Sequence, residues 1–178
     1  MECHLHTLHA HTQLLGKLAV ALAPPEPQLQ HAALRLTARG WETLPLPAPD
    51  GSGAPVVALD VHAHEAVAEH SDGRAHRVAL VPDRSVGDVT RRLLAAVGDM
   101  TGPFEINLTP QETPWSTPLD EDDEHATYDA GQVASYVAAA TRAALVLAAL
   151  DATPDELTRR PNATPPHTVA RTPASPPP

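Results

Sequence analysis

Residues 65–81 read EAVAEHSDGRAHRVALV, and this stretch decides the fold class. Two runs in which apolar and polar side chains alternate flank the four residues Ser71-Asp72-Gly73-Arg74. A period of two is typical of a strand with one buried face, and an Asp-Gly pair between two such runs is a strong hairpin signal. The stretch therefore predicts two antiparallel strands joined by a tight turn.

More candidate strands precede this hairpin without an intervening helix. Residues 33–39 alternate, Gly40 interrupts them, residues 42–46 can return as a strand, and residues 56–62 alternate again. Residues 104–108 form a further short candidate. Strands that follow one another directly pair antiparallel. We therefore expect an antiparallel sheet of about five strands.

Three stretches predict helices. Residues 7–23 place leucines on one stripe and end before a proline pair, and residues 86–98 repeat apolar residues with a 3.6-residue period after the candidate cap Ser85. Residues 130–150 form a long alanine-rich pattern with a broad apolar face, which Asp129 could cap. The expected fold is α+β, with three helices packed on the sheet.

The chain is predicted to hold a single α+β domain over residues 1–151 and a tail over residues 152–178. The tail is rich in proline and poor in apolar side chains. Such a segment cannot bury enough apolar area to offset its ordering entropy. We expect the tail to be disordered.

Composition narrows the function classes. The net charge is −10 and no basic cluster occurs, which disfavours nucleic acid as a partner. Cys3 is the single cysteine, so an intramolecular disulfide is excluded. The N-terminus lacks a signal-peptide pattern, and the longest apolar run, Ala143–Leu150, is shorter than the roughly 18 residues of a membrane span. We expect a cytoplasmic protein that does not enter the membrane.

Histidines are the candidates for metal binding. His62 and His64 share one face of a predicted strand, and His70 could join them across the hairpin. We expect that face to be solvated, because it opposes the apolar face. A two- or three-histidine site completed by Glu65 or Glu69 is the alternative, since imidazole is a common ligand of transition metals.

The first eleven residues carry four more histidines, which are His4, His6, His9 and His11. On a helix, a pair of ligands four residues apart would need a second histidine at position 7 for His11 or at position 13 for His9. Those positions hold Thr7 and Gln13. The favoured interpretation is a tract with weak, adventitious metal binding. The acidic run at residues 120–124 lacks the EF-hand pattern and is interpreted as favourable to a helix dipole.

A polar stripe on the first helix suggests a ligand site. His9, Gln13 and Lys17 are spaced four residues apart, and with Arg39 they could converge on a small anionic molecule. A plain solvent-exposed face is the alternative. No nucleophile-elbow or phosphate-loop motif is present.

The chain resembles a family of uncharacterised bacterial proteins, the DUF5996 family, over about residues 7–150. The resemblance rests on residues 8–17 (LHAHTQLLGK), residues 36–41 (LTARGW), residues 71–74 (SDGR), and residues 118–122 (PLDED) with His125 and Tyr128. It implies a fold and no reaction, and it makes His125 and Tyr128 the polar residues to follow as ligand-binding candidates.

Two departures from the family pattern matter. Members tend to carry tryptophan at the position of His11, and they tend to continue past the long helix with an aromatic- and glycine-rich segment. Here that segment is missing or replaced by the proline-rich tail. We therefore expect low stability or self-association through the helix at residues 130–150.

The function favoured by the sequence is a non-catalytic domain that binds a small molecule or a partner. A metal-dependent hydrolase that uses histidine with aspartate or glutamate ligands is one alternative. A divergent or truncated copy without the ancestral function is the other. The sequence identifies neither a cofactor nor a catalytic residue.

Overall fold

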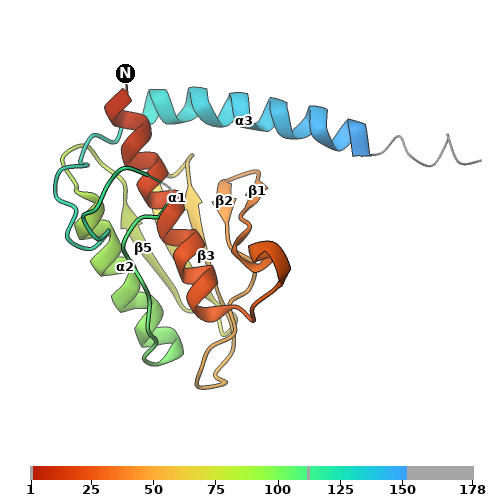
Figure 1. The fold of residues 1–178 in the computed structure, drawn as a ribbon, viewed down its shortest axis with the longest axis vertical. Coiled ribbons are helices and arrows are strands. Elements are labelled where there is room, and N and C mark those ends of the chain that lie inside the picture. Colours follow the sequence, from red (N-terminus) through yellow and green to blue (C-terminus); the bar gives the residue numbers. More distant parts are fainter. Residues whose placement is uncertain (1, 112, 152–178) are drawn as a thin grey trace, which may run out of the picture. The chain divides into compact units, whose positions relative to one another are not determined.

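The computed structural model describes residues 2–111 and 113–151, and its centre is one five-stranded antiparallel sheet (Figure 1). The strand order in space, β1-β2-β3-β4-β5, equals the order along the chain. The strands are β1 (Arg35–Thr37), β2 (Gly40–Glu42), β3 (Pro55–Asp60), β4 (Glu65–His70) and β5 (Ala75–Ala79). The helices are α1 (Glu2–Leu22), the short 3-10 helix η1 (Pro27–Ala32), α2 (Val86–Thr101) and α3 (Ala130–Asp151). The predicted α+β fold is confirmed.

The predicted hairpin joins β4 and β5. The N–H of His70 donates to the carbonyl of Arg74 at 2.8 Å, and the N–H of Arg74 donates to Oδ1 of Asp72 at 2.9 Å. Gly73 has a φ of 93°, a conformation that side chains with a Cβ rarely adopt. Local hydrogen bonds and one glycine therefore specify this turn.

One face of the sheet is buried beneath α1 and α2, which lie on the same side of it (Figure 1). Leu59 pairs with Ala66, which pairs with Val78, so these three side chains share that face. They pack against the leucine stripe of α1 and the valine and leucine stripe of α2. Each large apolar side chain buried here contributes about 1.5–3 kcal/mol.

The opposite face of the sheet carries a network of ion pairs. Arg39 contacts two glutamates, and Arg77 contacts two, with Glu69 shared between them. Beneath this network Ala58 and Val67 are almost completely buried. The charged side chains are Arg39, Glu42, Glu65, Glu69 and Arg77, and they cover the small apolar residues of this face without a helix.

The helix α2 begins as predicted. The N–H of Asp88 donates to the hydroxyl oxygen of Ser85 at 3.1 Å, which is an N-cap bond. The helix continues to Thr101, three residues beyond the expected end, and Gly102 ends it with a φ of 78°. Its buried residues recur with the helical period, as the sequence predicted.

The helix α3 is capped by Asp129, whose Oδ1 accepts a hydrogen bond from the N–H of Gln132 at 2.7 Å. Val133 and Val137 bury their side chains, whereas Tyr136 on the same turns is 47% exposed. The chain divides into two compact units, Met1–Ala144 and Leu145–Pro178. The predicted disordered tail lies outside the described residues.

The stretch Ala130–Ala149 has a mean hydropathy of 1.3. By length and composition alone it could cross a membrane, a criterion that core helices and leader sequences also satisfy. The expectation of a protein without a membrane segment therefore stays a prediction.

Three further predictions are wrong. The first helix begins at Glu2, not at residue 7, and residues 104–108 form no strand although Phe104 packs on the core. Gly40 starts β2 where we expected a break. A Cβ at Gly40 would overlap the carbonyl oxygen of Leu59, so the close approach of β3 requires glycine there.

Candidate ligand-binding site

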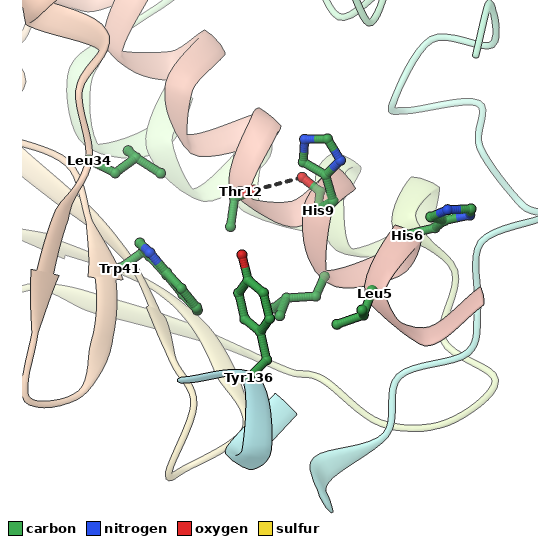
Figure 2. Close-up of a pocket in the computed structure, with 8 residues that line it drawn as sticks. Leu5, His6, His9, Thr12, Leu34, Trp41 and Tyr136 are labelled. Carbon is green, nitrogen blue, oxygen red and sulfur yellow. Dashed lines mark hydrogen bonds between the residues drawn. The ribbon is translucent and has the colours of Figure 1, made fainter. Parts of the chain in front are cut away.

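A pocket of about 660 Å³ lies between the first half of α1, β2 and the start of α3 (Figure 2). All of its lining residues belong to the unit Met1–Ala144. They are Leu5, His6, Leu8, His9, Thr12, Leu34, Trp41 and Tyr136. This volume falls within the range of small-molecule sites, which combine mainly apolar walls with a few polar groups.

Two aromatic side chains form one wall of the pocket. Trp41 pairs with Leu59 in the sheet, which places the indole on the face that carries α1. Tyr136 projects from α3, and the two ring centroids lie 5.8 Å apart with 35° between the planes. Figure 2 shows the Tyr136 hydroxyl directed toward Thr12 on α1. The wall offers a flat ligand a surface on which to stack.

A second hollow of about 290 Å³ continues along α1. It shares His9, Thr12 and Leu34 with the first pocket and adds Gln13 and Lys17. The predicted polar stripe therefore borders a groove. The ammonium of Lys17 donates to the carbonyl of Thr109 at 2.6 Å, and Gln13 Nε2 lies 3.4 Å from His9 Nε2. The described lining of both hollows contains no carboxylate.

Arg39 does not join this groove, which corrects the expected convergence. Its guanidinium contacts Glu42 at 3.3 Å and Glu69 at 3.1 Å on the opposite face of the sheet. Glu42 and Glu69 pair with this arginine on the face of the sheet that is opposite the one carrying α1.

A cluster of three imidazoles surrounds Trp115 next to the pocket. The centroid of the Trp115 ring lies 5.4 Å from that of His6, 5.8 Å from that of His9 and 4.6 Å from that of His125. The rings of His6 and His125 are 6.1 Å apart. His6 also lines the pocket, so this cluster adjoins it.

Within the cluster, His125 and Asp122 form a close pair. Nδ1 of His125 lies 2.7 Å from Oδ2 of Asp122, whose side chain is only 5% exposed. The other carboxylate oxygen accepts hydrogen bonds from the N–H groups of Glu124 and His125 at 3.2 and 3.1 Å. The carboxylate is thus held in place by the local backbone.

The acidic run at residues 120–124 stabilises a helix start, although not that of α3. The carbonyl of Asp122 accepts from the N–H of Gly87, and Asp123 accepts from the Ser85 hydroxyl at 2.9 Å. These contacts place the run at the N-terminus of α2, where negative charge is favourable.

His11 is 1% exposed and lies close enough to Asp122 to be influenced by its charge. Burial lowers the pKa of His11 to about 4, because desolvation disfavours the charged imidazolium, and the charge of Asp122 opposes this shift only in part. Nδ1 of His11 has no hydrogen-bond partner among the described residues. His11 is therefore neutral at pH 7 and belongs to the core.

Tyr128 is placed away from the pocket. It is 4% exposed, and its hydroxyl lies 3.0 Å from Nδ1 of His64. Burial, with a contribution from the charge of Asp60, raises the pKa of Tyr128 to about 12. The structure gives Tyr128 a bond that ties the β3–β4 turn to the segment before α3, and does not bring it together with His9 or Lys17.

The three weak metal candidates are separated. His62 lies after the end of β3 and contacts the carbonyl of Ala38 at 3.1 Å, while His64 contacts Tyr128. His70 is buried, contrary to the expected solvated face, because its ring packs under Gly53. Within residues 2–111 and 113–151, no group of three or more histidine, cysteine, aspartate or glutamate side chains is arranged to hold a metal.

A family model matches residues 1–153, and it describes a family of unknown function, DUF5996. The chain belongs to the DUF5996 family. Comparisons with curated proteins and with solved structures found no match. The family assignment confirms the resemblance, and function has to be argued from this DUF5996 domain itself.

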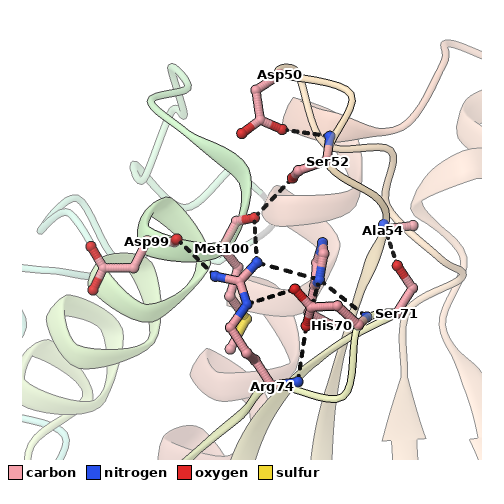
Figure 3. Close-up of polar contacts among 9 residues, drawn as sticks. Asp50, Ser52, Ala54, His70, Ser71, Arg74, Asp99 and Met100 are labelled. Carbon is pink, nitrogen blue, oxygen red and sulfur yellow. Dashed lines mark hydrogen bonds and ion pairs between the residues drawn. The ribbon is translucent and has the colours of Figure 1, made fainter.

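One sequence block of the DUF5996 domain is architectural. In the turn after β4, Arg74 reaches the end of α2 and donates to the carbonyls of Asp99 and Met100 at 3.2 and 3.4 Å (Figure 3). The same guanidinium pairs with Asp72 at 2.7 Å, beside buried His70. The block therefore joins the hairpin to a helix and lines neither hollow.

Several residues of the pocket and of the imidazole cluster beside it escaped sequence reasoning. Trp41 belongs to a block that carries the family resemblance, yet nothing local shows that it faces α1. Tyr136 lies in the stretch at residues 130–150, for which the sequence predicted only a broad apolar face, and His6 lies in the histidine tract, which was interpreted as a weak metal binder. Trp115 lies in a proline-rich loop that offered no periodic signal. Only the contacts between distant segments bring them together.

Proposed function

We propose that this DUF5996 domain binds a small molecule with a flat apolar body in the pocket between α1, β2 and α3. The observation that carries the proposal is the aromatic wall of Trp41 and Tyr136 above an apolar floor in a hollow of about 660 Å³. Polar groups along one side, from His9 and Thr12, could orient the ligand.

We further propose that the ligand carries an anionic group directed along α1. The groove continues past Gln13 to Lys17, and its described lining holds the imidazole of His9 and the ammonium of Lys17 but no carboxylate. Complementary charge favours anions over neutral analogues of the same shape.

The test uses two probes of equal shape, naphthalene-2-carboxylate and naphthalene-2-carboxamide, titrated calorimetrically into the protein. We expect the carboxylate to bind, and Tyr136→Ala to weaken it by about tenfold, which corresponds to the loss of one aromatic stacking contact. Val81→Ala serves as the matched control, since Val81 is a half-exposed side chain outside both hollows.

Each half of the proposal has its own refutation. If neither probe binds at millimolar concentration, or if Tyr136→Ala equals Val81→Ala, the pocket is not a ligand site for flat molecules. If carboxylate and carboxamide bind equally, the anionic part of the proposal is wrong while the aromatic part stands.

A further inference from the structure

We propose that His125, oriented by Asp122, is the general base of a hydrolytic site for small aromatic esters at the His6 end of the pocket. The inference rests on the proposed ligand binding, because His6 lines the pocket and its ring lies 6.1 Å from that of His125. A bound ester whose acyl end points toward His6 would be a neighbour of His125.

The hydrogen bond to Asp122 determines which nitrogen can accept a proton. A carboxylate only accepts hydrogen bonds, so the 2.7 Å contact requires the hydrogen on Nδ1. The neutral ring then carries its lone pair on Nε2. The fixed carboxylate also stabilises the imidazolium that forms when Nε2 takes up a proton.

The surroundings favour this role over that of a plain surface pair. The Asp122 side chain is 5% exposed and the His125 side chain 19% exposed, so the carboxylate is buried and part of the imidazole reaches the surface. Trp115 packs on the imidazole at 4.6 Å and limits the orientations of the ring. Partial exclusion of water strengthens the interaction between the two groups.

Water is the nucleophile that fits the described residues. The hydroxyls of Thr7 and Thr127 lie 3.2 Å from each other, and Thr7 is fully buried. The structure pairs the His125 side chain with the carboxylate of Asp122. The proposal therefore uses water in place of the covalent nucleophile of a triad.

The reaction step is a direct hydrolysis. Nε2 of His125 takes a proton from water as the water oxygen forms a bond to the ester carbonyl carbon. The tetrahedral intermediate collapses, the bond from carbon to the alcohol oxygen breaks, and the imidazolium returns its proton to that oxygen. The products are the carboxylic acid and the alcohol, and His125 regains its starting state.

The experiment follows the hydrolysis of 6-acetoxynaphthalene-2-carboxylate, which carries the proposed anionic group at one end and the ester at the other, by the appearance of 6-hydroxynaphthalene-2-carboxylate. We expect His125→Gln to lower kcat/KM by about 10²–10⁴-fold, the usual contribution of a general base. His76→Gln is the matched control, because His76 is an exposed histidine on β5. This substitution should leave kcat/KM unchanged, because an exposed imidazole outside the site contributes only background hydrolysis.

Asp122 acts by positioning the ring of His125. A loss of rate alone would also follow from a purely structural role, so the tautomer of His125 is measured as well. Asp122→Asn keeps an oxygen acceptor for the N–H groups of Glu124 and His125, so the loop can still form. Its amide would donate to Nδ1 and place the ring hydrogen on Nε2, which abolishes proton acceptance. We expect a rate loss together with a changed tautomer of His125 in the nitrogen NMR spectrum.

A wild-type rate no higher than that of free imidazole, or a His125→Gln rate equal to that of His76→Gln, would overturn the inference. Binding of naphthalene-2-carboxylate to His125→Gln separates the two proposals. Retained binding without turnover in the wild type means that the pocket binds ligands and His125 is not a base. Absent binding in the wild type removes the proposed function itself.

Discussion

The guanidinium of Arg74 donates a hydrogen bond to the carbonyl of Asp99 across 3.2 Å, and so joins the β4–β5 turn to the last turn of α2. The carbonyls at the end of a helix lack partners within the helix, and a cation there also complements the helix dipole. One side chain thus connects the sheet edge to the helix that covers it.

Replacement of Arg74 by alanine should lower the free energy of unfolding by about 1–2 kcal/mol, the value of one or two partly exposed charged hydrogen bonds. Urea denaturation measures the change. Arg92→Ala is the control, because Arg92 makes only an exposed i,i+4 pair with Asp88, worth about 0.3–0.5 kcal/mol. Equal losses in the two variants would show that the contact with α2 contributes nothing.

The carboxyl of Asp72 should add stability that disappears in acid. The hydrogen bond from the Arg74 N–H, followed by that from His70, holds the pKa of Asp72 well below its usual value of 3.8. A carboxyl with a lowered folded-state pKa stabilises above its unfolded pKa and loses this effect as the pH falls below it.

The free energy of unfolding of the wild type should therefore exceed that of Asp72→Asn by a constant amount from pH 7 to about 5. This difference should shrink below about pH 4. Unfolding curves over this range measure it. Glu121→Gln, at an exposed position in the acidic run, should show no such trend. A difference that does not vary with pH would rule out the carboxylate as the cause.

Burial of His11 predicts a second, separate decrease in the free energy of unfolding as the pH falls. Its pKa falls from 6.5 to about 4 on folding, so the unfolded chain binds the proton more readily. Stability is then complete above about pH 6.5 and falls by up to about 3 kcal/mol as the pH drops toward 4. His11→Leu should remove this slope, and His76→Gln should retain it. A His11 resonance that titrates near pH 6.5 in NMR would contradict the prediction.

Gly40 should not tolerate a side chain. Alanine there would overlap the Leu59 carbonyl and adopt a φ of 137°, so we expect a loss of 3 kcal/mol or more, at about the upper limit of backbone strain. Gly51 is the control, because its φ is also positive and nothing lies within 4 Å of an added Cβ. In thermal unfolding, the melting temperature of Gly40→Ala should lie well below that of Gly51→Ala. Equal melting temperatures would contradict the steric argument.

The exposed apolar residues of α3 lead us to expect self-association with a second copy. Leu145, Val146 and Leu147 are each more than 60% exposed. Arg142 lies near the middle of the apolar stretch, which would cost a membrane span about 2.5–3.5 kcal/mol. Residues 152–178 contain eight prolines and only two large apolar side chains.

Light scattering across a concentration series measures this association. Leu145→Lys should shift the equilibrium toward the monomer by at least tenfold, because a charge would replace a buried apolar contact. Arg142→Lys keeps the charge and should leave the equilibrium nearly unchanged. A monomer at all concentrations, or binding to neutral phospholipid vesicles in place of dimerisation, would show that a second copy does not cover the exposed apolar residues of α3.

Local sequence determined the parts of the DUF5996 domain whose hydrogen bonds close within a few residues. The Ser71–Arg74 turn, the Ser85 cap of α2 and the Asp129 cap of α3 were all predictable, because each bond joins residues two or three positions apart. The alternating and helical periods likewise assigned the buried faces of the sheet and of α2.

Only the tertiary structure decided where the candidate site lies. Trp41 and Tyr136 are 95 positions apart, and His6 is 119 positions from His125, yet each pair is in ring contact. Periodicity states which face of an element is buried and not what covers it. Arg39 illustrates the limit: the sequence placed it near the stripe on α1, and pairing with Glu42 and Glu69 turned it to the other face of the sheet.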